Sequence, residues 1–321
     1  MQNPSYIPDF ETLTAGLISV INEDESERSL VGVLARKPNE YAGKRYVSEI
    51  VTCRLDDNRL VQLFIKYEMP GGKGRTELAY EARVYRHILH PLRLSTPKFY
   101  GSYTDTRTGA TWLVLEYLPD ALPLTDIWEP SSIAEAASWL GRFHAANAHP
   151  RAVAQPLFLK IYNAEYYLEH AHRALKYSDA SPSFSWLHNV WQHLKEFIIP
   201  FWNNTAITHG DYYLHNILLR DGMVHPIDWE FAGIDLPEMD LACLTDGLPA
   251  DTAQQCELAY QKARWTNGCP DILEQSLCAA RLCLCFYNLG TRPNWIKEAQ
   301  GLWYSRQLRS VAEQLGLIGA S

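Results

Sequence analysis

The chain has 321 residues, and 47% of them are hydrophobic, as in an ordinary globular protein. Its formal net charge of −8 at pH 7 and its lack of a lysine-rich run exclude a basic nucleic-acid-binding surface. The apolar stretches are too short and too interrupted to span a bilayer, and the length favours two lobes over one compact domain.

The first part of the chain has the pattern of an antiparallel sheet. Apolar, β-prone runs predict three strands, at 29–36, 45–55 and 60–66. A loop over 37–44 joins the first two strands, and Asp-Asp-Asn at 56–58 predicts a tight turn into the third. The third strand ends in Lys66.

A glycine-rich connection follows at 70–76, with the sequence Pro-Gly-Gly-Lys-Gly-Arg-Thr. A P-loop needs two glycines spaced by four residues and then a lysine followed directly by Ser or Thr, and this segment has neither feature. We therefore interpret it as a flexible basic connection between a strand and a helix. The helix predicted next spans 76–89 and carries Glu77 and Glu81 on one face.

Residues 111–118 have the pattern of a buried strand that breaks at a Pro-Asp pair. We predict an N-terminal lobe over 1–116 and a helical C-terminal lobe over 117–321. In the second lobe, Ser-Ile-Ala-Glu at 132–135 predicts a capping box that opens a helix running through His144.

The strongest chemical signal is Thr-His-Gly-Asp-Tyr-Tyr-Leu-His-Asn at 208–216. Asp211 precedes Asn216 by five positions, which is the spacing of the kinase catalytic loop, and Asp228 follows behind a predicted hairpin turn at 220–222. One carboxylate can deprotonate an incoming hydroxyl, while the amide and the other carboxylate can hold a metal ion on nucleotide phosphates. An ordinary turn and a surface acid are the alternative for each piece alone, but the ordered set disfavours it.

The segment from Ile207 to Ala242 resembles the aminoglycoside phosphotransferase and choline kinase superfamily, relatives of protein kinases that act on small molecules. In that family the loop reads His-Gly-Asp, four residues and Asn, and the metal-binding segment typically reads Ile-Asp-Trp-Glu. Both forms occur here, at 209–216 and 227–230, and Met-Asp-Leu-Ala at 239–242 resembles the family's Asp-Leu-Ala helix start. The resemblance implies an α+β, bilobal protein-kinase-like fold, with an antiparallel-sheet N-terminal lobe containing one helix and a mainly helical C-terminal lobe.

The same resemblance implies transfer of the γ-phosphate of ATP, or of GTP, to a hydroxyl of a small molecule, with Mg²⁺. It implies that Asp211 is the catalytic base, that Asn216 and Asp228 bind Mg²⁺, and that Asp240 supports the loop structurally. His144 resembles the family's helix-terminal histidine, for which we expect a packed position near the loop.

For the nucleotide, Lys66 is expected to reach the α- and β-phosphates, as the third-strand lysine of kinases does. A solvent-facing lysine on an edge strand is the alternative. Glu81 is its expected ion-pair partner, with Glu77 as second choice, and Gly43 lies in the loop expected to cover the phosphates. The resemblance places the adenine contacts on backbone groups of Glu116, Tyr117 and Leu118.

Two features bear on the acceptor. The helical lobe is rich in aromatic residues, most of them core, and a minority is expected to line the acceptor site. The acids Glu230, Asp235 and Glu238, together with Asp246, have no role on metal or as base, so they suit an amine-bearing acceptor such as an aminoglycoside-type antibiotic or an amino alcohol. Solvated or helix-capping acids are the alternative.

Two alternative functions are a protein kinase and a catalytically inactive pseudokinase. A protein kinase inserts a long activation segment before its Ala-Pro-Glu motif, whereas Pro237 follows Asp228 by nine positions. A catalytically inactive pseudokinase is disfavoured because the base, both metal ligands and the Lys–Glu pair are present.

The N-terminal residues lack the basic segment and apolar core of a secretory signal. The seven cysteines are scattered and form no Cys-x-x-Cys pair, which indicates packed thiols rather than a metal site. Both features predict a cytoplasmic protein.

Overall fold

The computed structural model describes residues 6–22, 29–39, 46–68, 77–148, 158–292, 295 and 298–319. The chain divides into two compact units. Unit 1 comprises Met1–Pro123 and Leu218–Glu230, and unit 2 comprises Leu124–Ile217 and Phe231–Ser321.

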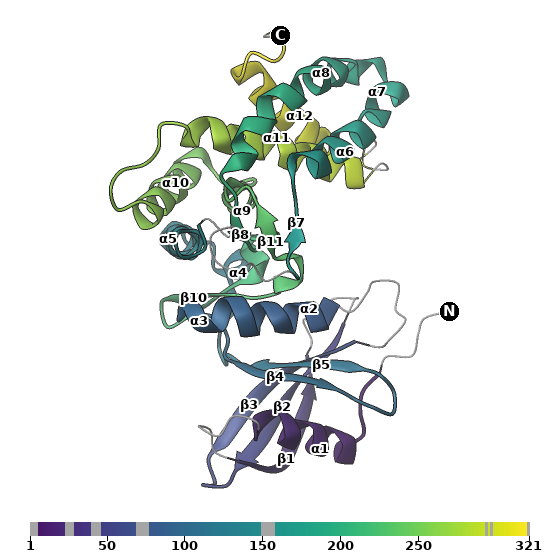
Figure 1. The fold of residues 1–321 in the computed structure, drawn as a ribbon, viewed down its shortest axis with the longest axis vertical. Coiled ribbons are helices and arrows are strands. Elements are labelled where there is room, and N and C mark those ends of the chain that lie inside the picture. The colour runs from purple at the N-terminus through teal and green to yellow at the C-terminus, as the bar shows by residue number, and fades with distance from the viewer. Residues whose placement is uncertain are drawn as a thin grey trace. The chain divides into compact units, whose positions relative to one another are not determined.

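Unit 1 is built on a five-stranded antiparallel sheet with the order β1-β2-β3-β5-β4 (Figure 1). Its strands are β1 (Leu30–Pro38), β2 (Val47–Leu55), β3 (Leu60–Glu68), β4 (Phe99–Thr104) and β5 (Thr111–Glu116). The three strands expected from the sequence before Lys66 are confirmed, and so is the buried strand expected after 111. The α+β class is confirmed as well.

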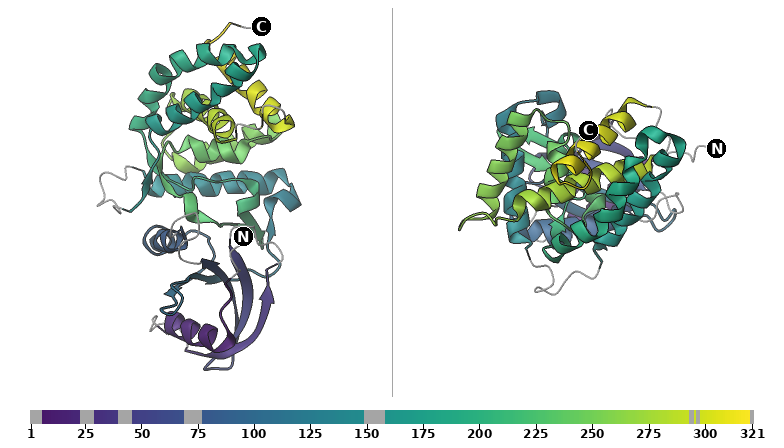
Figure 2. Two further views of the ribbon diagram at one scale, coloured as in Figure 1. Left: turned by 90° about the vertical axis from the view of Figure 1, so that its right-hand side faces the viewer. Right: turned by 90° about the horizontal axis from the view of Figure 1, so that it is seen from above.

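The alternation of side chains along β3 assigns each face of the sheet to a helix. Leu63, Ile65 and Tyr67 are buried in one hydrophobic core with α1 (Phe10–Ile21), which the sequence analysis did not predict and which lies against the sheet in Figures 1 and 2. Because side chains alternate between faces along a strand, Lys66 lies on the opposite face. That face carries α2 (Glu77–Val84), which continues as a π-helical turn, η1 (Tyr85–Leu89), and a short α3 (His90–Leu92).

A second, three-stranded sheet completes unit 1, with the order β10-β9-β6. Its strands are β6 (Leu122–Pro123), β9 (Ile217–Arg220) and β10 (Met223–Pro226). The turn between β9 and β10 contains Asp221 at φ 51° and Gly222 at φ 76°, the left-handed pair that tight hairpins require. The expected hairpin is therefore confirmed. The hairpin pairs with β6, and residues 218–230, which the sequence predicts as part of the C-terminal lobe, belong to unit 1.

Unit 2 is mainly helical. Its longer helices are α5 (Pro130–Ala146), α6 (Ala164–Ala174), α8 (Trp186–Ile198), α9 (Glu238–Thr245), α10 (Ala250–Arg264), α11 (Leu273–Thr291) and α12 (Ala299–Gln314). The shorter helices are α4 (Leu124–Ile127), α7 (Lys176–Ala180) and the 3₁₀ turns η2 (Pro182–Phe184), η3 (Ile199–Asn203), η4 (Leu214–Asn216) and η5 (Trp229–Phe231), the last of which begins in unit 1. Helix α11 packs between α6 and α12 (Figures 1 and 2).

The expected capping box at 132–135 is wrong. Helix α5 begins two residues earlier, with Pro130 in its first turn and Glu129 as the N-cap. The hydroxyl of Ser132 donates instead to the Glu129 carboxylate, at 3.1 Å. Proline is favoured at the first helical position because its missing N–H has no partner there in any case.

A small sheet in unit 2 positions the loop that follows Thr208. Strand β11 (Gly233–Asp235) pairs with β7 (Lys160–Ile161) on one side and with β8 (Ala206–Thr208) on the other. Strand β8 leads directly into the predicted catalytic loop, and β11 leads into α9. Among the described helices, none combines the length and apolar composition that crossing a bilayer requires.

Candidate active site

The two residues of the predicted catalytic loop lie together. The side-chain amide of Asn216, in η4, donates to the backbone oxygen of Asp211 at 3.0 Å and to its carboxylate oxygen Oδ2 at 2.8 Å. The backbone nitrogen of Asp211 donates to Nδ1 of His209 at 3.2 Å. Residues of the loop itself therefore hold Asp211 in place, and the amide nitrogen of Asn216 faces the Asp211 carboxylate.

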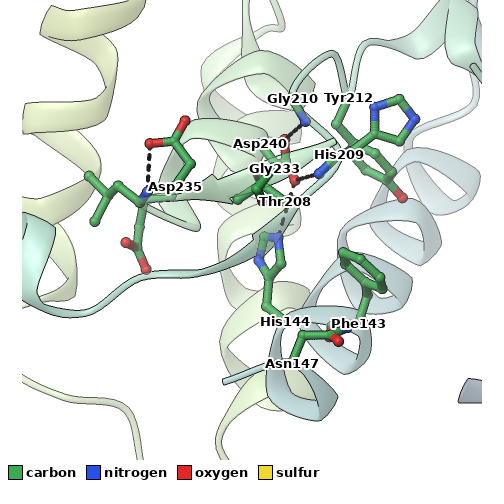
Figure 3. A network of polar contacts seen from close by, with 12 residues as sticks. Phe143, His144, Asn147, Thr208, His209, Gly210, Tyr212, Gly233, Asp235 and Asp240 are labelled. Atoms are coloured by element: carbon green, nitrogen blue, oxygen red, sulfur yellow. Dashed lines mark hydrogen bonds and ion pairs between the residues drawn. The ribbon is translucent and has the colours of Figure 1, made fainter. Parts of the chain in front are cut away.

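The carboxylate of Asp240, at the start of α9, clamps the loop from below (Figure 3). It accepts hydrogen bonds from the backbone nitrogens of His209 at 2.7 Å and Gly210 at 2.9 Å, and Nε2 of His144 lies 3.1 Å away. Hydrogen bonds to a charged acceptor are about twice as strong as neutral ones. The expected structural role of Asp240 is confirmed.

His144 is fully buried, as expected, and it joins two helices. Its Nε2 faces Asp240, so this nitrogen carries the proton, while Nδ1 lies 3.0 Å from the hydroxyl of Tyr260 on α10. Burial lowers the pKa of His144, although the Asp240 carboxylate opposes this effect. A neutral imidazole is consistent with a packed, non-catalytic position.

Gly210 is required by the geometry of the loop. Its φ of +80° lies in the left-handed region, and a Cβ added there would lie 2.2 Å from the backbone oxygen of Phe231. Any other residue would have to move either the loop or the segment after Glu230.

Beside the loop lies a cavity of about 80 Å³ within unit 2. Asp211 and Asp235 are on its lining, with six aromatic residues: Tyr162, Tyr166, Tyr167, Tyr213, Phe231 and Tyr287. They come from the β7–α6 segment, the loop itself, the segment before β11, and α11. Elements far apart in the sequence thus place aromatic side chains on the same cavity lining as Asp211.

Asp235 is the second carboxyl on this lining, and both of its oxygens are engaged. Oδ2 accepts from the hydroxyl of Tyr167 at 2.5 Å, and Oδ1 accepts from the backbone nitrogen of Leu236 at 2.7 Å. Burial raises the pKa of Asp235 well above its usual range, against the effect of these hydrogen bonds.

A second group of charged residues lies in unit 1. Nζ of Lys66 lies 3.1 and 3.2 Å from the two carboxylate oxygens of Glu81, and 2.6 Å from Oδ1 of Asp228. Burial alone would lower the pKa of Lys66, but the two carboxylates outweigh it and raise the pKa above its usual value. Burial raises the pKa of Glu81 to about 7, against the attraction of Lys66.

A family model described as the phosphotransferase enzyme family matches residues 54–272, which is more than half of the chain. The chain belongs to this family. The protein is thus a phosphotransferase, as the sequence predicted.

Solved structures share the fold of this phosphotransferase at low sequence identity. The GDP complex of wild-type aminoglycoside 2'-phosphotransferase-IIIa has a TM-score of 0.63 at 13% identity, over 96% of this chain and 99% of that one. An aminoglycoside phosphotransferase, described as putative, from Ralstonia eutropha has a TM-score of 0.61 at 16% identity, over 95% and 96% of the two chains. A choline kinase from Streptococcus pneumoniae has a TM-score of 0.53 at 15% identity, over 90% and 95%. No curated protein matches the sequence.

These neighbours show that the phosphotransferase has the fold of the protein-kinase-like small-molecule kinases. The expected fold and the family resemblance are both confirmed.

The remaining acids expected at the acceptor site lie in different parts of the structure. Glu238 is buried and engaged by Arg264 at 2.6 Å and by the hydroxyl of Ser276 at 2.8 Å, and it is not on the cavity lining, so we leave it out of the acceptor site. Glu230 belongs to unit 1, where its carboxylate accepts from the hydroxyl of Tyr46 at 2.6 Å. Asp246 accepts from the hydroxyl of Tyr304 at 2.8 Å.

The nucleotide contacts expected from the resemblance are only partly described. Gly43 lies outside the described residues, and of Glu77 only its place at the start of α2 is described. The backbone nitrogens of Glu116 and Tyr117 already donate to the carbonyls of Lys98 and Gln62, at 2.8 and 3.1 Å. An adenine contact at this segment would therefore use their carbonyl oxygens or the amide of Leu118.

The sequence did not indicate which tyrosines engage these acids, namely Tyr46, Tyr167 and Tyr304. A tyrosine next to a functional acid in space carries no spacing signal, because its partner is far away in the sequence. The bond between Tyr46 and Glu230 joins residues 184 positions apart.

Proposed function

We propose that this phosphotransferase transfers the γ-phosphate of ATP or GTP to a hydroxyl of a small acceptor that binds in the aromatic cavity beside Asp211. The observation that carries the proposal is the placement of the Asp211 carboxylate on the cavity lining, with Asn216 holding one of its oxygens. A carboxylate held in this way is oriented before the acceptor arrives.

In the proposed reaction, Asp211 accepts the proton of the acceptor hydroxyl as the oxygen forms its bond to the γ-phosphorus. The bond between the γ-phosphorus and the bridging oxygen breaks, and the nucleoside diphosphate leaves. Asp211 contributes mainly by orienting the hydroxyl, because the transition state of phosphoryl transfer is loose.

On the nucleotide, Lys66 binds the phosphates as a cation fixed by Glu81. The ligand chemistry of Asn216 and Asp228 fits Mg²⁺, which prefers oxygen donors and few protein ligands beside the phosphates. The amide nitrogen of Asn216 is turned toward Asp211, so its carbonyl oxygen is directed elsewhere. Mg²⁺ would supply neutralisation of the phosphate charge.

The described residues contain no group of three or more His, Cys, Asp or Glu side chains arranged to hold a metal ion. A Mg²⁺ site made of one amide, one carboxylate and nucleotide oxygens needs no such group.

For the acceptor, the lining favours an amino alcohol over an aminoglycoside-type antibiotic. The carboxyls on it are Asp211, Asp235 and Asp240, and Asp240 is committed to the loop. A molecule with several ammonium groups would need more negative charge than this. A single ammonium can instead be bound by aromatic faces, with an attraction of about 0.5–2 kcal/mol per ring.

The test is release of nucleoside diphosphate from purified protein, with ATP and with GTP, across amino alcohols, sugars, aminoglycosides and a peptide mixture. We expect acceptor-dependent release that EDTA abolishes and that small amino alcohols support best. Release that is efficient only with peptides, or no acceptor-dependent release at all, would overturn the proposal.

A further inference from the structure

The segment that carries Asp228 is attached to the rest of unit 1 at three consecutive residues. Asp228 pairs with Lys66 on β3, and the backbone nitrogen of Trp229 donates to Oε1 of Glu81 at 3.2 Å. The carboxylate of Glu230 accepts from the hydroxyl of Tyr46 at 2.6 Å. The first two contacts involve residues already given roles, whereas the third introduces a tyrosine with none.

Tyr46 contacts both Lys66 and Glu230. It lies immediately before β2, where Ser48 stands opposite Lys66 in the sheet register. Its ring centroid is 5.8 Å from Nζ of Lys66, within the range of a cation–π contact. One side chain therefore contacts the lysine expected to bind phosphate and the segment that carries the metal-binding acid.

Glu230 is suited to link Tyr46 to Asp228. It is buried, with 5% of its surface exposed, so its bond to Tyr46 is shielded from water. A hydrogen bond to a buried charge is costly to remove, because water cannot replace the lost donor there. Glu230 is two residues from Asp228, so a shift of its side chain moves the backbone that aims Asp228.

Asp228 itself needs such support. Its φ is +68°, in the left-handed region that non-glycine residues rarely adopt. Aspartate tolerates this conformation better than most residues do, but the surrounding contacts must hold it there.

We propose that Tyr46 is a positioning residue for the nucleotide and its metal ion: it fixes Glu230, and through it the orientation of Asp228, while its ring confines the Lys66 ammonium. This inference rests on the proposed function, because it presumes that Lys66 and Asp228 act on the nucleotide. Tyr46 itself makes no contact with the reacting atoms in this account.

Tyr46→Phe removes the hydroxyl and keeps the ring. Its matched control is Tyr6→Phe, because the hydroxyl of Tyr6 also donates to a carboxylate of unit 1, that of Asp105, at 2.6 Å. The readout is the affinity for ADP by calorimetry, with and without Mg²⁺, so it does not depend on turnover. A purely structural role would lower the melting temperatures of both variants and leave the gain in affinity from Mg²⁺ unchanged.

We expect Tyr46→Phe to weaken Mg²⁺-dependent ADP binding about tenfold or more, as losing a hydrogen bond to a charged group does. Binding without Mg²⁺ and the acceptor KM should change little, and Tyr6→Phe should match the wild type. Glu230→Gln retains an acceptor for the Tyr46 hydroxyl and should be mild, whereas Glu230→Leu should match Tyr46→Phe. The double variant Tyr46→Phe/Glu230→Leu should be no worse than either single one, since both remove the same contact.

Lys66→Ala and Asp228→Ala separate the two claims. If they lose Mg²⁺-dependent ADP binding while Tyr46→Phe behaves like Tyr6→Phe, the positioning role of Tyr46 is wrong and the proposed function stands. If Lys66→Ala and Asp228→Ala both keep wild-type binding and turnover, both the positioning role of Tyr46 and the proposed function are wrong.

Discussion

Lys66 and Asp228 lie 162 positions apart in the sequence, and in the structure Nζ of the first is 2.6 Å from Oδ1 of the second. Lys66 also contacts both carboxylate oxygens of Glu81, so one ammonium lies between two carboxylates. When all three side chains are ionised, the charges of Lys66, Glu81 and Asp228 sum to −1. That balance suits a divalent cation arriving with a nucleotide, because the lysine can bind phosphate while Asp228 binds the metal.

Lys66→Met should abolish most nucleotide affinity and reduce turnover by about 10²-fold or more, since it removes a charge placed for the phosphates. It also leaves Glu81, which is fully buried, without its cation. The measurement is ADP binding together with the melting temperature. The control is Lys66→Met/Glu81→Met, which should recover stability because the uncompensated buried acid is gone, but should not recover binding. Recovery of binding in this double variant would show that the charge of Lys66 is not what the nucleotide needs.

Asp240→Asn should misplace the catalytic loop. The amide of Asn has one oxygen and one NH2 group, so one of the backbone nitrogens of His209 and Gly210 would lose its acceptor and face a donor instead, at a cost of about 3 kcal/mol in the free energy of unfolding. Turnover should fall about 10²-fold, as a displacement of about 1 Å at a reacting group can cause. Denaturant unfolding and steady-state kinetics check both effects. Asp246→Asn is the matched control, because Asp246 contacts Tyr304 rather than the loop, and it should retain turnover. Equal loss in both variants would contradict the clamp.

His170 should make the stability of the fold depend on pH. Its ring packs edge-on against Tyr166 and at a tilt against Tyr287, with centroids 4.8 and 4.7 Å away, and burial lowers its pKa to about 4. The unfolded chain takes up a proton as the pH falls through about 6.5, whereas the folded protein does so only near 4. The stability that His170 contributes is therefore fully present above about pH 6.5 and is lost as the pH falls toward 4.

The measurement for His170 is the free energy of unfolding of the wild type and of His170→Phe from pH 4 to 8. The phenylalanine keeps an aromatic ring between the two tyrosines and does not titrate. We expect the difference between the two proteins to be constant above pH 7 and to shift in favour of the variant below about 6.5. Parallel curves over the whole range would show that His170 does not carry the effect.

Tyr287→Ala should weaken the acceptor and spare the nucleotide. The ring forms one wall of the cavity beside Asp211. Losing an aromatic contact of this kind is worth about 1.5–3 kcal/mol, so the acceptor KM should rise at least about tenfold. The KM for the nucleotide should stay within a factor of about two. Tyr304→Ala removes a comparable ring that is not on the lining, and its acceptor KM should match the wild type. A selective rise in the nucleotide KM for Tyr287→Ala would contradict the assignment of the cavity.

Local patterns predicted what is encoded locally. An apolar, β-prone run predicted the strand that contains Lys66, an Asp-Gly pair predicted the hairpin at 221–222, and the spacing of the kinase catalytic loop paired Asp211 with Asn216. Glu81 was identified by its place on a helix after that strand, and the structure joins it to Lys66.

Tertiary packing determined what the sequence could not reveal. Helix α1 packs on one face of the sheet, and its sequence carries no motif that would have predicted this position. Glu238 was expected at the acceptor site, but Arg264 engages it from α10, a contact that no periodicity predicts. No sequence pattern distinguishes the aromatic residues of unit 2 that line the cavity from those that pack in the core. The lining residues are determined by how α6, α11 and the catalytic loop pack together. The capping box failed because the proline two residues earlier offered a competing helix start.

The most direct test of the account is the single-turnover rate of phosphoryl transfer by Asp211→Asn, measured at saturating nucleotide and acceptor alongside ADP affinity. The account predicts a rate lower by about 10²–10⁴-fold, the usual contribution of a positioned base, with ADP affinity and melting temperature close to those of the wild type. A transfer rate within a factor of about three of the wild type would contradict it, because an amide cannot take up the proton assigned to Asp211.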